Sequence, residues 1–310
     1  MSSVVPEGWI SSQLGSLGVF SKGKGISKKE TLPDGIPCIR YAEIYTVYDF
    51  RIKTFKSFIS PITAKTSKKL TKNDIIFAGS GETVEDIGKS VAFTLDCDAY
   101  VGGDSIVLSP SNDLDSTFLS YQLNDNIRRS QLRKLGQGSS VIHIYSSGLH
   151  EVTLSIPPLP EQKKIASILT SVDEVIENTQ RQIDKLQDLK KATMNELLTK
   201  GIGHTEFKDS ELGRIPKSWE VGEVSIYCEE VFLGLTSKVD YVDSGGVPLI
   251  RATDISKGRL SFEKVRCISE AQHQKLTKYR QASRGDILVS KSGSLGVCAI
   301  VDTDKEFSIY

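Results

Sequence analysis

The sequence has few cysteines and no long apolar segment. Its five cysteines lie far apart and form no C-x-x-C pair, which argues against a zinc site and against a disulfide framework. No apolar run approaches the ~18 residues of a membrane-spanning helix, and no signal peptide is recognisable. We therefore expect a soluble protein of a reducing, cytoplasmic compartment, with no membrane partner.

Net charge and enzyme motifs are lacking as well. Lys+Arg and Asp+Glu both number 39, so any basic binding surface has to be local. No nucleophile elbow, H-E-x-x-H or dinucleotide-binding motif occurs. The tripeptide Gly88-Lys89-Ser90 resembles the end of a phosphate-binding loop, but that loop needs a glycine where Thr83 stands. The four histidines have no ligand-spaced partners, so the sequence predicts no catalytic residue, no metal and no cofactor.

A long amphipathic helix is the clearest positive feature. The segment from Leu159 to Lys200 has no glycine, and no proline after Pro160, which suits a first helical turn. Gly201 follows as a helix stop, and about 1.5 Å per residue gives a rod of about 60 Å. Apolar residues recur every three or four positions along it, which predicts an apolar stripe on one face: Ile165, Ile168, Leu169, Val172, Val175, Ile176, Ile183, Leu186, Leu189, Met194, Leu197 and Leu198.

The residues before this helix predict a mixed α/β domain. Short apolar, β-branched runs alternate with breaks rich in Gly, Pro, Ser and Asn. One longer segment, Ser116 to Leu135, is predicted to be helical and is basic at its end. The expected strands are Pro37 to Arg40, Asp74 to Phe77, Ser90 to Leu95, Ser105 to Leu108 and Val152 to Ile156.

The residues after the helix repeat the pattern of the residues before it. The matches keep their order and an offset of about 210 residues, which indicates an internal repeat. Gly88 pairs with Gly296 if the second copy is shorter there. The other matches are Pro6 and Trp9 with Pro216 and Trp219, Gly35 to Arg40 with Gly246 to Arg251, Asp74 to Ile76 with Asp286 to Leu288, and Ser80-Gly81 with Ser292-Gly293.

The fold class expected from this repeat is α/β, with two mixed domains joined by the long amphipathic, coiled-coil-like helix. We place the first domain at 1–156, the spacer helix at 157–201, a polar linker at 202–214 and a partial second domain at 215–310. Tyr310 aligns near Tyr100, so the second domain is expected to be incomplete and the less well packed of the two.

Two basic segments of the first domain are candidates for binding DNA. Seven basic and no acidic residues lie between Arg51 and Lys72, with Phe55 and Phe58 among them. The second segment is the glycine-rich loop Ser21 to Gly25. One charge run alone is usually a solvated face, but two in one domain favour nucleic-acid binding. The phosphate-contact candidates are Lys22, Lys24, Lys65, Lys68 and Lys69.

Polar turns and two arginines are further candidates. The Ser-Gly turns after the Asp-Ile strands offer hydroxyl and N–H donors for phosphates or base edges, or are simply tight turns that need glycine. Arg40 and Arg251 end matching strands and could either bind guanine or pair with Glu43 and Asp254; the ion pairs are slightly favoured. The turn candidates are Ser80, Thr83, Lys291, Ser292 and Ser294.

These features together resemble the specificity subunit of type I restriction-modification systems. The resemblance covers nearly the whole chain in the right order. Its strongest parts are Gly138-Ser139-Ser140-x-x-His143-Ile144 and the run Ile156-Pro157-Pro158-Leu159-Pro160-Glu161-Gln162-Lys163-Lys164-Ile165. The other matching segments are Pro6-x-Gly-Trp9, Ile215-Pro216-x-x-Trp219, Ile250 to Ile255 and Gly285 to Gly293.

The resemblance implies two target-recognition domains that each read half of a split sequence in double-stranded DNA. It also implies a non-catalytic role, in which two methyltransferase subunits carry S-adenosylmethionine and restriction subunits join the complex. Family members pair a second long helix with the first, and this sequence shows only one. We therefore expect its stripe to mediate subunit contacts, including self-association through Ile165, Ile168, Leu169, Val172, Val175, Ile176, Ile183, Leu186 and Leu197.

The alternative is a coiled-coil structural adaptor whose terminal domains bind protein. An adaptor has no need of the basic segments, whereas a DNA-binding protein does. A third hypothesis, a nucleotide-binding enzyme that uses Lys89, predicts ATP binding that is lost in Lys89→Ala.

Overall fold

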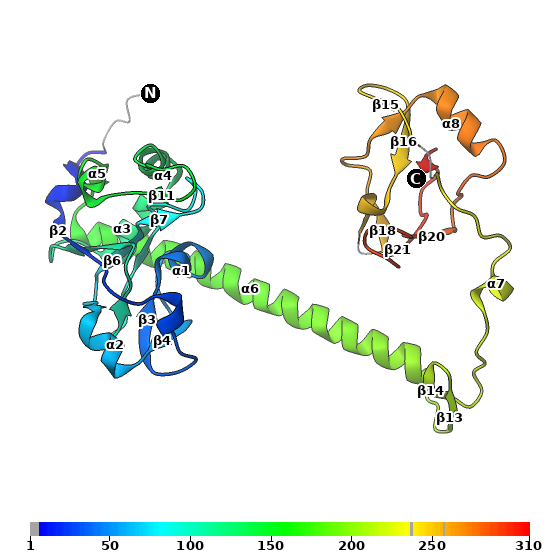
Figure 1. Ribbon diagram of the computed structural model, residues 1–310, viewed down its shortest axis with the longest axis horizontal. Coiled ribbons are helices and arrows are strands. Elements are labelled where there is room, and N and C mark those ends of the chain that lie inside the picture. The colour runs from blue at the N-terminus through cyan, green and yellow to red at the C-terminus, as the bar shows by residue number, and fades with distance from the viewer. Residues whose placement is uncertain (1–5, 236–237, 257) are drawn as a thin grey trace. The chain divides into compact units, whose positions relative to one another are not determined.

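The computed structural model describes residues 6–235, 238–256 and 258–310 (Figure 1). The chain divides into two compact units, Met1–Ala192 and Thr193–Tyr310, and each is described by itself. Both mix short strands with helices, which confirms the α/β class. The long helix is confirmed too, as α6 (Leu159–Lys200).

Short strands form the frame of the first unit, with small helices between them. The helices before α6 are α1 (Tyr41–Thr46), α2 (Pro61–Thr66), α3 (Ser116–Leu123), α4 (Asn126–Arg133) and α5 (Ser146–His150). The strands are β1 (Ile10–Gln13), β2 (Gly18–Lys22), β3 (Ile36–Ile39), β4 (Ser57–Ile59), β5 (Lys68–Lys69), β6 (Ile75–Ala78), β7 (Ser80–Gly81), β8 (Ser90–Ala92), β9 (Tyr100–Val101), β10 (Ser105–Pro110), β11 (Ile142–His143) and β12 (Thr153–Ile156).

Two four-stranded sheets organise this unit. The first has the order β2-β10-β6-β8 and is antiparallel throughout. The second has the order β4-β3-β9-β5, and in it β3 and β9 run parallel. Two short antiparallel pairs, β1 with β12 and β7 with β11, complete the frame.

Strand β6 separates two hydrophobic cores. All four of its residues are buried, as a continuous apolar run predicts for a strand covered on both faces. Because side chains alternate along a strand, Ile75 and Phe77 join the core that contains residues of α3 and α4. Ile76 and Ala78 join the core that contains Ile44 of α1. The first unit is therefore assembled around this strand.

The helix expected from Ser116 to Leu135 is wrong in one respect, because it is two helices. α3 ends at Leu123, and the Asn124 side chain donates to the carbonyl oxygens of Ser90 and Ser120. Asp125 then caps α4 by accepting from the backbone N–H of Arg128 at 2.7 Å. Asn and Asp are neutral to unfavourable inside a helix but strong at its ends, so this pair is a boundary.

The first turns of α6 belong to the core of the first unit. Gln162 is 1% exposed, and its amide bonds three backbone groups: it accepts from Asp115 N and donates to the oxygens of Asp113 and Pro157. Ala166 is buried in the same core as α3, and Ile165 packs against it. In Figure 1 the helix leaves this packed region as a rod.

The second unit contains two more helices and ten strands among its described residues. The helices are α7 (Val224–Tyr227) and α8 (Glu270–Thr277). The strands are β13 (Phe207–Ser210), β14 (Gly213–Pro216), β15 (Tyr241–Val242), β16 (Val247–Ile250), β17 (Ile255–Ser256), β18 (Arg259–Leu260), β19 (Cys267–Ile268), β20 (Ile287–Val289), β21 (Cys298–Ile300) and β22 (Ser308–Ile309).

Equivalent pairings recur in the two units, which confirms the repeat. β16 runs parallel to β22 as β3 does to β9, and β20 pairs with β21 as β6 does with β8. Three loop hydrogen bonds of the first unit recur in the second. The bond from Trp9 N to Pro6 O matches that from Trp219 N to Pro216 O, and the bond from Thr71 N to the Asp74 carboxylate matches that from Ser283 N to the Asp286 carboxylate. The third pair is Gly88 N to Ala78 O and Gly296 N to Ser290 O. The last pair confirms the match of Gly88 with Gly296.

The second unit is the less well packed, as the sequence predicts. Ile287 and Val289 of β20 are 65% and 60% exposed, whereas Ile75 and Phe77 of the equivalent β6 are fully buried. Within the described residues β20 pairs with β21 alone, while β6 lies between two strands. The side of β20 that corresponds to the β10 side of β6 has no partner strand among the described residues, and the apolar side chains of β20 are exposed to water.

The segment expected to be a polar linker, 202–214, is partly a hairpin. Its residues form β13 and the start of β14, which pair antiparallel from Phe207 opposite Pro216 to Ser210 opposite Gly213. Gly213 has φ +98°, a backbone conformation that residues with a side chain rarely adopt. This glycine therefore forms part of the tight turn between β13 and β14.

Gln162→Leu should destabilise the first unit. The change leaves one backbone N–H and two carbonyl oxygens buried without partners, at a cost of about 2 kcal/mol or more. The measurement is urea unfolding followed by Trp9 fluorescence in a Trp219→Phe background. The exposed Gln182→Leu is the matched control and should change little. Equal stability of the two variants would contradict the anchoring role of Gln162.

Candidate nucleic-acid interface

The two predicted basic segments of the first unit converge on strand β9. Lys24 N donates to Val101 O at 3.2 Å, and Lys68 lies opposite Val101 in the β5–β9 register. Lys22, Lys24, Lys65 and Lys69 are exposed and Lys68 is half-buried. The structure therefore brings the backbones of Lys24 and of Lys68–Lys69, which come from segments far apart in the sequence, to the same strand.

Glycine allows the first of these segments to approach β9. A Cβ atom on Gly23 would lie 1.9 Å from the carbonyl oxygen of Gly102, so no side chain fits there. Gly25 has φ +67°, and its N-terminal neighbour is Lys24. The loop is thus held by its backbone, and the lysine side chains are free to point into solvent.

Acidic residues divide the basic run between Arg51 and Lys72. Lys69 lies 2.7 Å from Asp98, whose hydrogen bond raises the pKa of the lysine. Lys72 lies 3.5 Å from Asp96. Arg51 and Lys53 face α6 instead, where they pair with Glu174 and Glu177. The run is consequently not one continuous basic surface, because acidic partners distant in sequence neutralise parts of it.

Arg40 and Arg251 form the ion pairs that the sequence offered as their alternative role. Arg40 Nε and NH2 lie 3.0 and 2.9 Å from Oε1 of the buried Glu43. Arg251 donates to both carboxylate oxygens of Asp254 at 3.0 and 3.1 Å, and this bond raises the pKa of the guanidinium. Each guanidinium donates two hydrogen bonds to a carboxylate that also caps the helix or turn beginning at that arginine. Fewer N–H donors of the arginine therefore remain for a contact with a base.

The loop after β6 is fixed on both sides. Ser80 is 2% exposed, and its hydroxyl lies 2.8 Å from Nδ1 of His143 in β11. Thr83 is exposed, and its N–H and hydroxyl both bond the Asp86 carboxylate, at 3.0 and 2.9 Å. Of the two candidates, only Thr83 is open to solvent.

Arg129 holds the far side of the same loop, and sequence reasoning missed it. It is 8% exposed, and its guanidinium donates to the carbonyl oxygens of Ile87, at 2.9 Å, and Glu85. The sequence showed only that the segment containing Arg129 is basic at its end. His143 was likewise treated as one of several scattered histidines, although the G-S-S-x-x-H motif that contains it was the available signal.

The corresponding loop of the second unit is shorter and exposed. Lys291, Ser292 and Ser294 are all accessible. The Ser290 hydroxyl bonds the carbonyl of Ser294 and accepts from Val297 N at 2.9 Å, which closes the turn. These three candidates are therefore presented on a closed, solvent-facing loop.

The two units differ in the loop that carries Lys22 and Lys24. Leu235 N donates to Ile309 O at 2.9 Å, as Lys24 N does to Val101 O. Because β22 is equivalent to β9, Leu235 takes the place of Lys24. Leucine has no charge for a phosphate, so this position can contribute an electrostatic contact in the first unit but not in the second.

The Gly88-Lys89-Ser90 tripeptide does not form a phosphate-binding loop. Ser90 is fully buried in β8, and Lys89 O accepts from Ala78 N within the sheet. Burial lowers the pKa of Lys89, and the nearby Asp49 partly opposes this. The nucleotide-enzyme hypothesis therefore loses its site, because the N–H groups of Gly88, Lys89 and Ser90 already donate to Ala78 O, Asp86 O and the Asn124 side chain.

Among the described residues, no three His, Cys, Asp or Glu side chains are grouped closely enough to hold a metal ion. In the parts of the chain that the structure describes, no helix combines the length and hydropathy needed to cross a membrane.

The apolar stripe of α6 is largely exposed. Ile165 is the exception, because it packs against the core of the first unit. The other predicted interface residues are 38–64% exposed: Ile168, Leu169, Val172, Val175, Ile176, Ile183, Leu186 and Leu197. Burying such side chains is worth ~1.5 kcal/mol or more each, so the stripe is a surface suited to association.

Two related α/β units, one long helix and a cluster of lysines define a modular binding scaffold. The profile of the family "Type I restriction modification DNA specificity domain" matches residues 6–188, and the chain belongs to this family. Members of this class are DNA-recognition subunits and not catalytic ones.

Full-length relatives support this assignment. The MjaVIII specificity subunit of Methanocaldococcus jannaschii is 26% identical over 99% of this chain and 70% of its own length. The EcoKI specificity subunit of Escherichia coli K12 is 24% identical over 96% of this chain and 65% of its own length. The chain thus spans about two thirds of these relatives. Among solved structures, the type I S subunit from M. genitalium aligns with a TM-score of 0.48 at 16% identity, over 99% of this chain and 71% of that one.

Arg129→Met should loosen the loop between β7 and β8. Two carbonyl oxygens lose a charged donor, which is worth about 1.5 kcal/mol or more and corresponds to roughly tenfold faster local exchange. Hydrogen exchange of residues 82–88 measures this. Arg133→Met, on the exposed side of α4, is the matched control. Unchanged protection in Arg129→Met would show that the guanidinium does not hold the loop.

Proposed function

We propose that this chain recognises a bipartite sequence in double-stranded DNA, with one half-site bound by each α/β unit. The observation that carries the proposal is the repeat: the same pairings and loop hydrogen bonds occur on either side of one 42-residue helix. A rod of about 60 Å could space two recognition units by one to two DNA turns of roughly 34 Å.

Phosphate contacts are assigned to the lysine cluster around β9. Lys24, Lys68 and Lys69 lie next to this strand, Lys22 and Lys65 belong to β2 and α2, and all of these lysines except Lys68 are exposed. Contacts to bases or phosphates are assigned to the loop residues Thr83, Lys291, Ser292 and Ser294, which are also accessible. Ser80 is assigned a supporting role, because its hydroxyl is buried against His143.

The partners follow from the family. We propose that two methyltransferase subunits dock on this scaffold and carry both S-adenosylmethionine and the adenine-methylating chemistry. Restriction subunits would join the same complex, and the compartment would be the cytoplasm. Family membership and the names of the relatives, which are type I restriction enzyme specificity subunits, support this proposal.

Self-association through α6 is a second proposal, supported by the exposed stripe. Leu186, Leu189 and Leu198 are 63%, 61% and 70% exposed, on a helix whose apolar packing against a core is confined to Ile165 and Ala166 in its first turns. Pairing two copies antiparallel would bury these side chains against one another.

A salt titration of DNA binding tests the first proposal. Replacing Lys22, Lys24, Lys65 and Lys69 by Ala should flatten the dependence of log K on log[salt] by up to about 0.9 per lost phosphate contact. Four exposed lysines of α6, Lys185, Lys190, Lys191 and Lys200, provide the control. Binding that does not depend on salt would favour the adaptor alternative instead.

Sedimentation tests self-association. Ile183→Lys with Leu186→Lys should convert a dimer into a monomer, because each buried lysine replaces ~1.5 kcal/mol or more of apolar burial with a desolvated charge. Asp188→Lys with Asn195→Lys, both exposed residues on the side of the helix opposite the stripe, should leave the mass unchanged. A wild-type chain that is monomeric at all concentrations would refute the dimer.

A further inference from the structure

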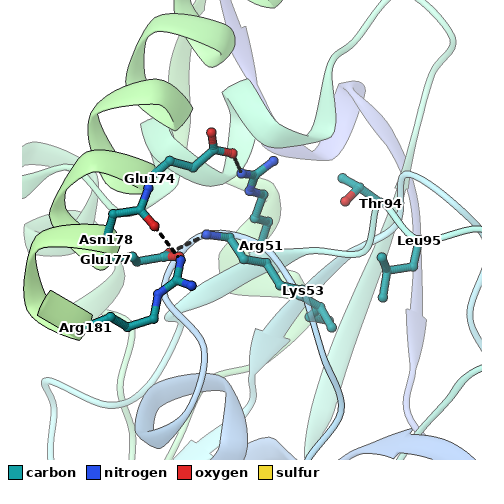
Figure 2. A pocket seen from close by; sticks show the side chains of 9 residues that line it. Arg51, Lys53, Thr94, Leu95, Glu174, Glu177, Asn178 and Arg181 are labelled. Atoms are coloured by element: carbon teal, nitrogen blue, oxygen red, sulfur yellow. Dashed lines mark hydrogen bonds and ion pairs between the residues drawn. The ribbon is translucent and has the colours of Figure 1, made fainter. Parts of the chain in front are cut away.

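Helix α6 touches the first unit a second time, well beyond its buried first turns. The Tyr121 hydroxyl bonds Thr170 and Asp173, Arg51 NH2 lies 2.7 Å from Glu174, and Lys53 pairs with Glu177. Figure 2 shows Arg51 and Lys53 reaching from the first unit toward the two glutamates of the helix. We call these contacts the polar anchor, and the contacts of Gln162 and Ala166 the buried anchor.

Two separated anchors fix a direction, whereas one fixes only a point. Glu177 follows Gln162 by about four turns, which is roughly 20 Å along the helix axis. The buried anchor alone would leave the rod able to pivot at its start. The polar anchor supplies the second point, so it sets the angle at which α6 leaves the first unit.

The polar anchor rests on a backbone that is itself fixed. Ile52 N donates to Ala92 O at 3.0 Å and Ala92 N to Phe50 O at 2.9 Å, which holds the Phe50–Lys53 segment against strand β8. Phe50 stacks on Tyr121 with ring centroids 4.5 Å apart. Burial, followed by the bond to Asp173, raises the pKa of Tyr121 to about 12, so the phenol stays protonated and donates.

The two ion pairs of the polar anchor are partly open to solvent. An open cleft of about 460 Å³ lies beside the ion pairs and is lined by Thr94, Leu95 and Arg181 as well as by the paired residues. The Arg51 and Glu174 side chains are 26% and 54% exposed, and those of Lys53 and Glu177 are 38% and 40% exposed. Charges in such a position are screened by salt, so the angle of the helix depends on electrostatics.

We propose that Arg51, Lys53 and Tyr121 are positioning residues that fix the direction of α6 relative to the first unit. Through this direction they set how strictly the two DNA half-sites must be spaced. The statement about direction stands on the contacts alone, and the statement about spacing rests on the proposed function. Arg51 and Lys53 therefore belong to the scaffold and not to the basic surface that contacts phosphates.

The direction of α6 relative to the first unit is tested by double electron–electron resonance between two spin labels on the full chain. Spin labels are placed at Ser130→Cys on α4 and Asp188→Cys on α6, both exposed sites, after Cys97, Cys228, Cys267 and Cys298 are changed to Ser. The intact polar anchor should give one narrow distance distribution. Glu174→Gln with Glu177→Gln should broaden it, and so should ~1 M salt, where the Debye length is about 3 Å.

Charge exchange separates positioning from a loss of folding. Arg51→Glu with Lys53→Glu should broaden the distribution, and adding Glu174→Arg with Glu177→Lys should narrow it again. Glu196→Gln, which removes an ion pair within α6 only, should change nothing. An unchanged width in the neutralised variants, or a width that charge exchange does not restore, would overturn the proposal.

A spacer series tests the DNA clause. Targets whose half-sites lie one base pair closer or farther apart should bind the wild-type chain less tightly. In Glu174→Gln with Glu177→Gln, the ratio of the affinities for the optimal and the altered spacer should fall toward one. A preference that persists despite a broadened distance distribution would refute the spacing clause. A smaller salt slope in Arg51→Ala with Lys53→Ala would show that these residues contact phosphates instead. Absence of DNA binding by the wild type would refute the proposed function and leave the distance result standing.

Discussion

The amide of Gln162 joins a solvent-exposed rod to a folded domain. It bonds backbone groups on two sides of the helix start, and these bonds are made in the core that also contains α3 and β6. The first turn of a helix is costly to form, and most helical stability in proteins comes from packing, so the packed first turns give α6 a stable start. Because the helix starts inside the core, its first turns are held by the packing of the domain. The later turns then extend an existing helix, which is easier than starting a new one.

The two units share a backbone pattern more closely than a set of side chains. The parallel pairings β3–β9 and β16–β22 and the bond from Gly88 or Gly296 back to the preceding strand are common to both. The side chains on the equivalent loops differ, with Lys24 in one unit and Leu235 in the other. The shared fold is thus held by backbone N–H and C=O groups, whereas the side chains on the equivalent loops differ between the two units.

Periodic and local features were predictable from the sequence, and partners distant in sequence were not. The bounds of α6 and the buried strand β6 follow from spacing and from Pro160 and Gly201, because these signals act within a few residues. The break at Asn124-Asp125 was also a local signal, though a weaker one. The partners of Arg51, Lys53 and Arg129 lie more than forty residues away, so a charge count could not separate ion-paired cations from free ones.

Gly23 fixes the path of its loop without constraining the side chains beside it. Its missing side chain lets the loop lie against Gly102, and the loop is then tied down through Lys24 N, a bond that any residue other than proline at that position could make. Substitutions beside this glycine alter the exposed chemistry without removing a structural contact. The path of the loop is thus independent of the side chains that flank Gly23, so those positions can change at little risk to folding.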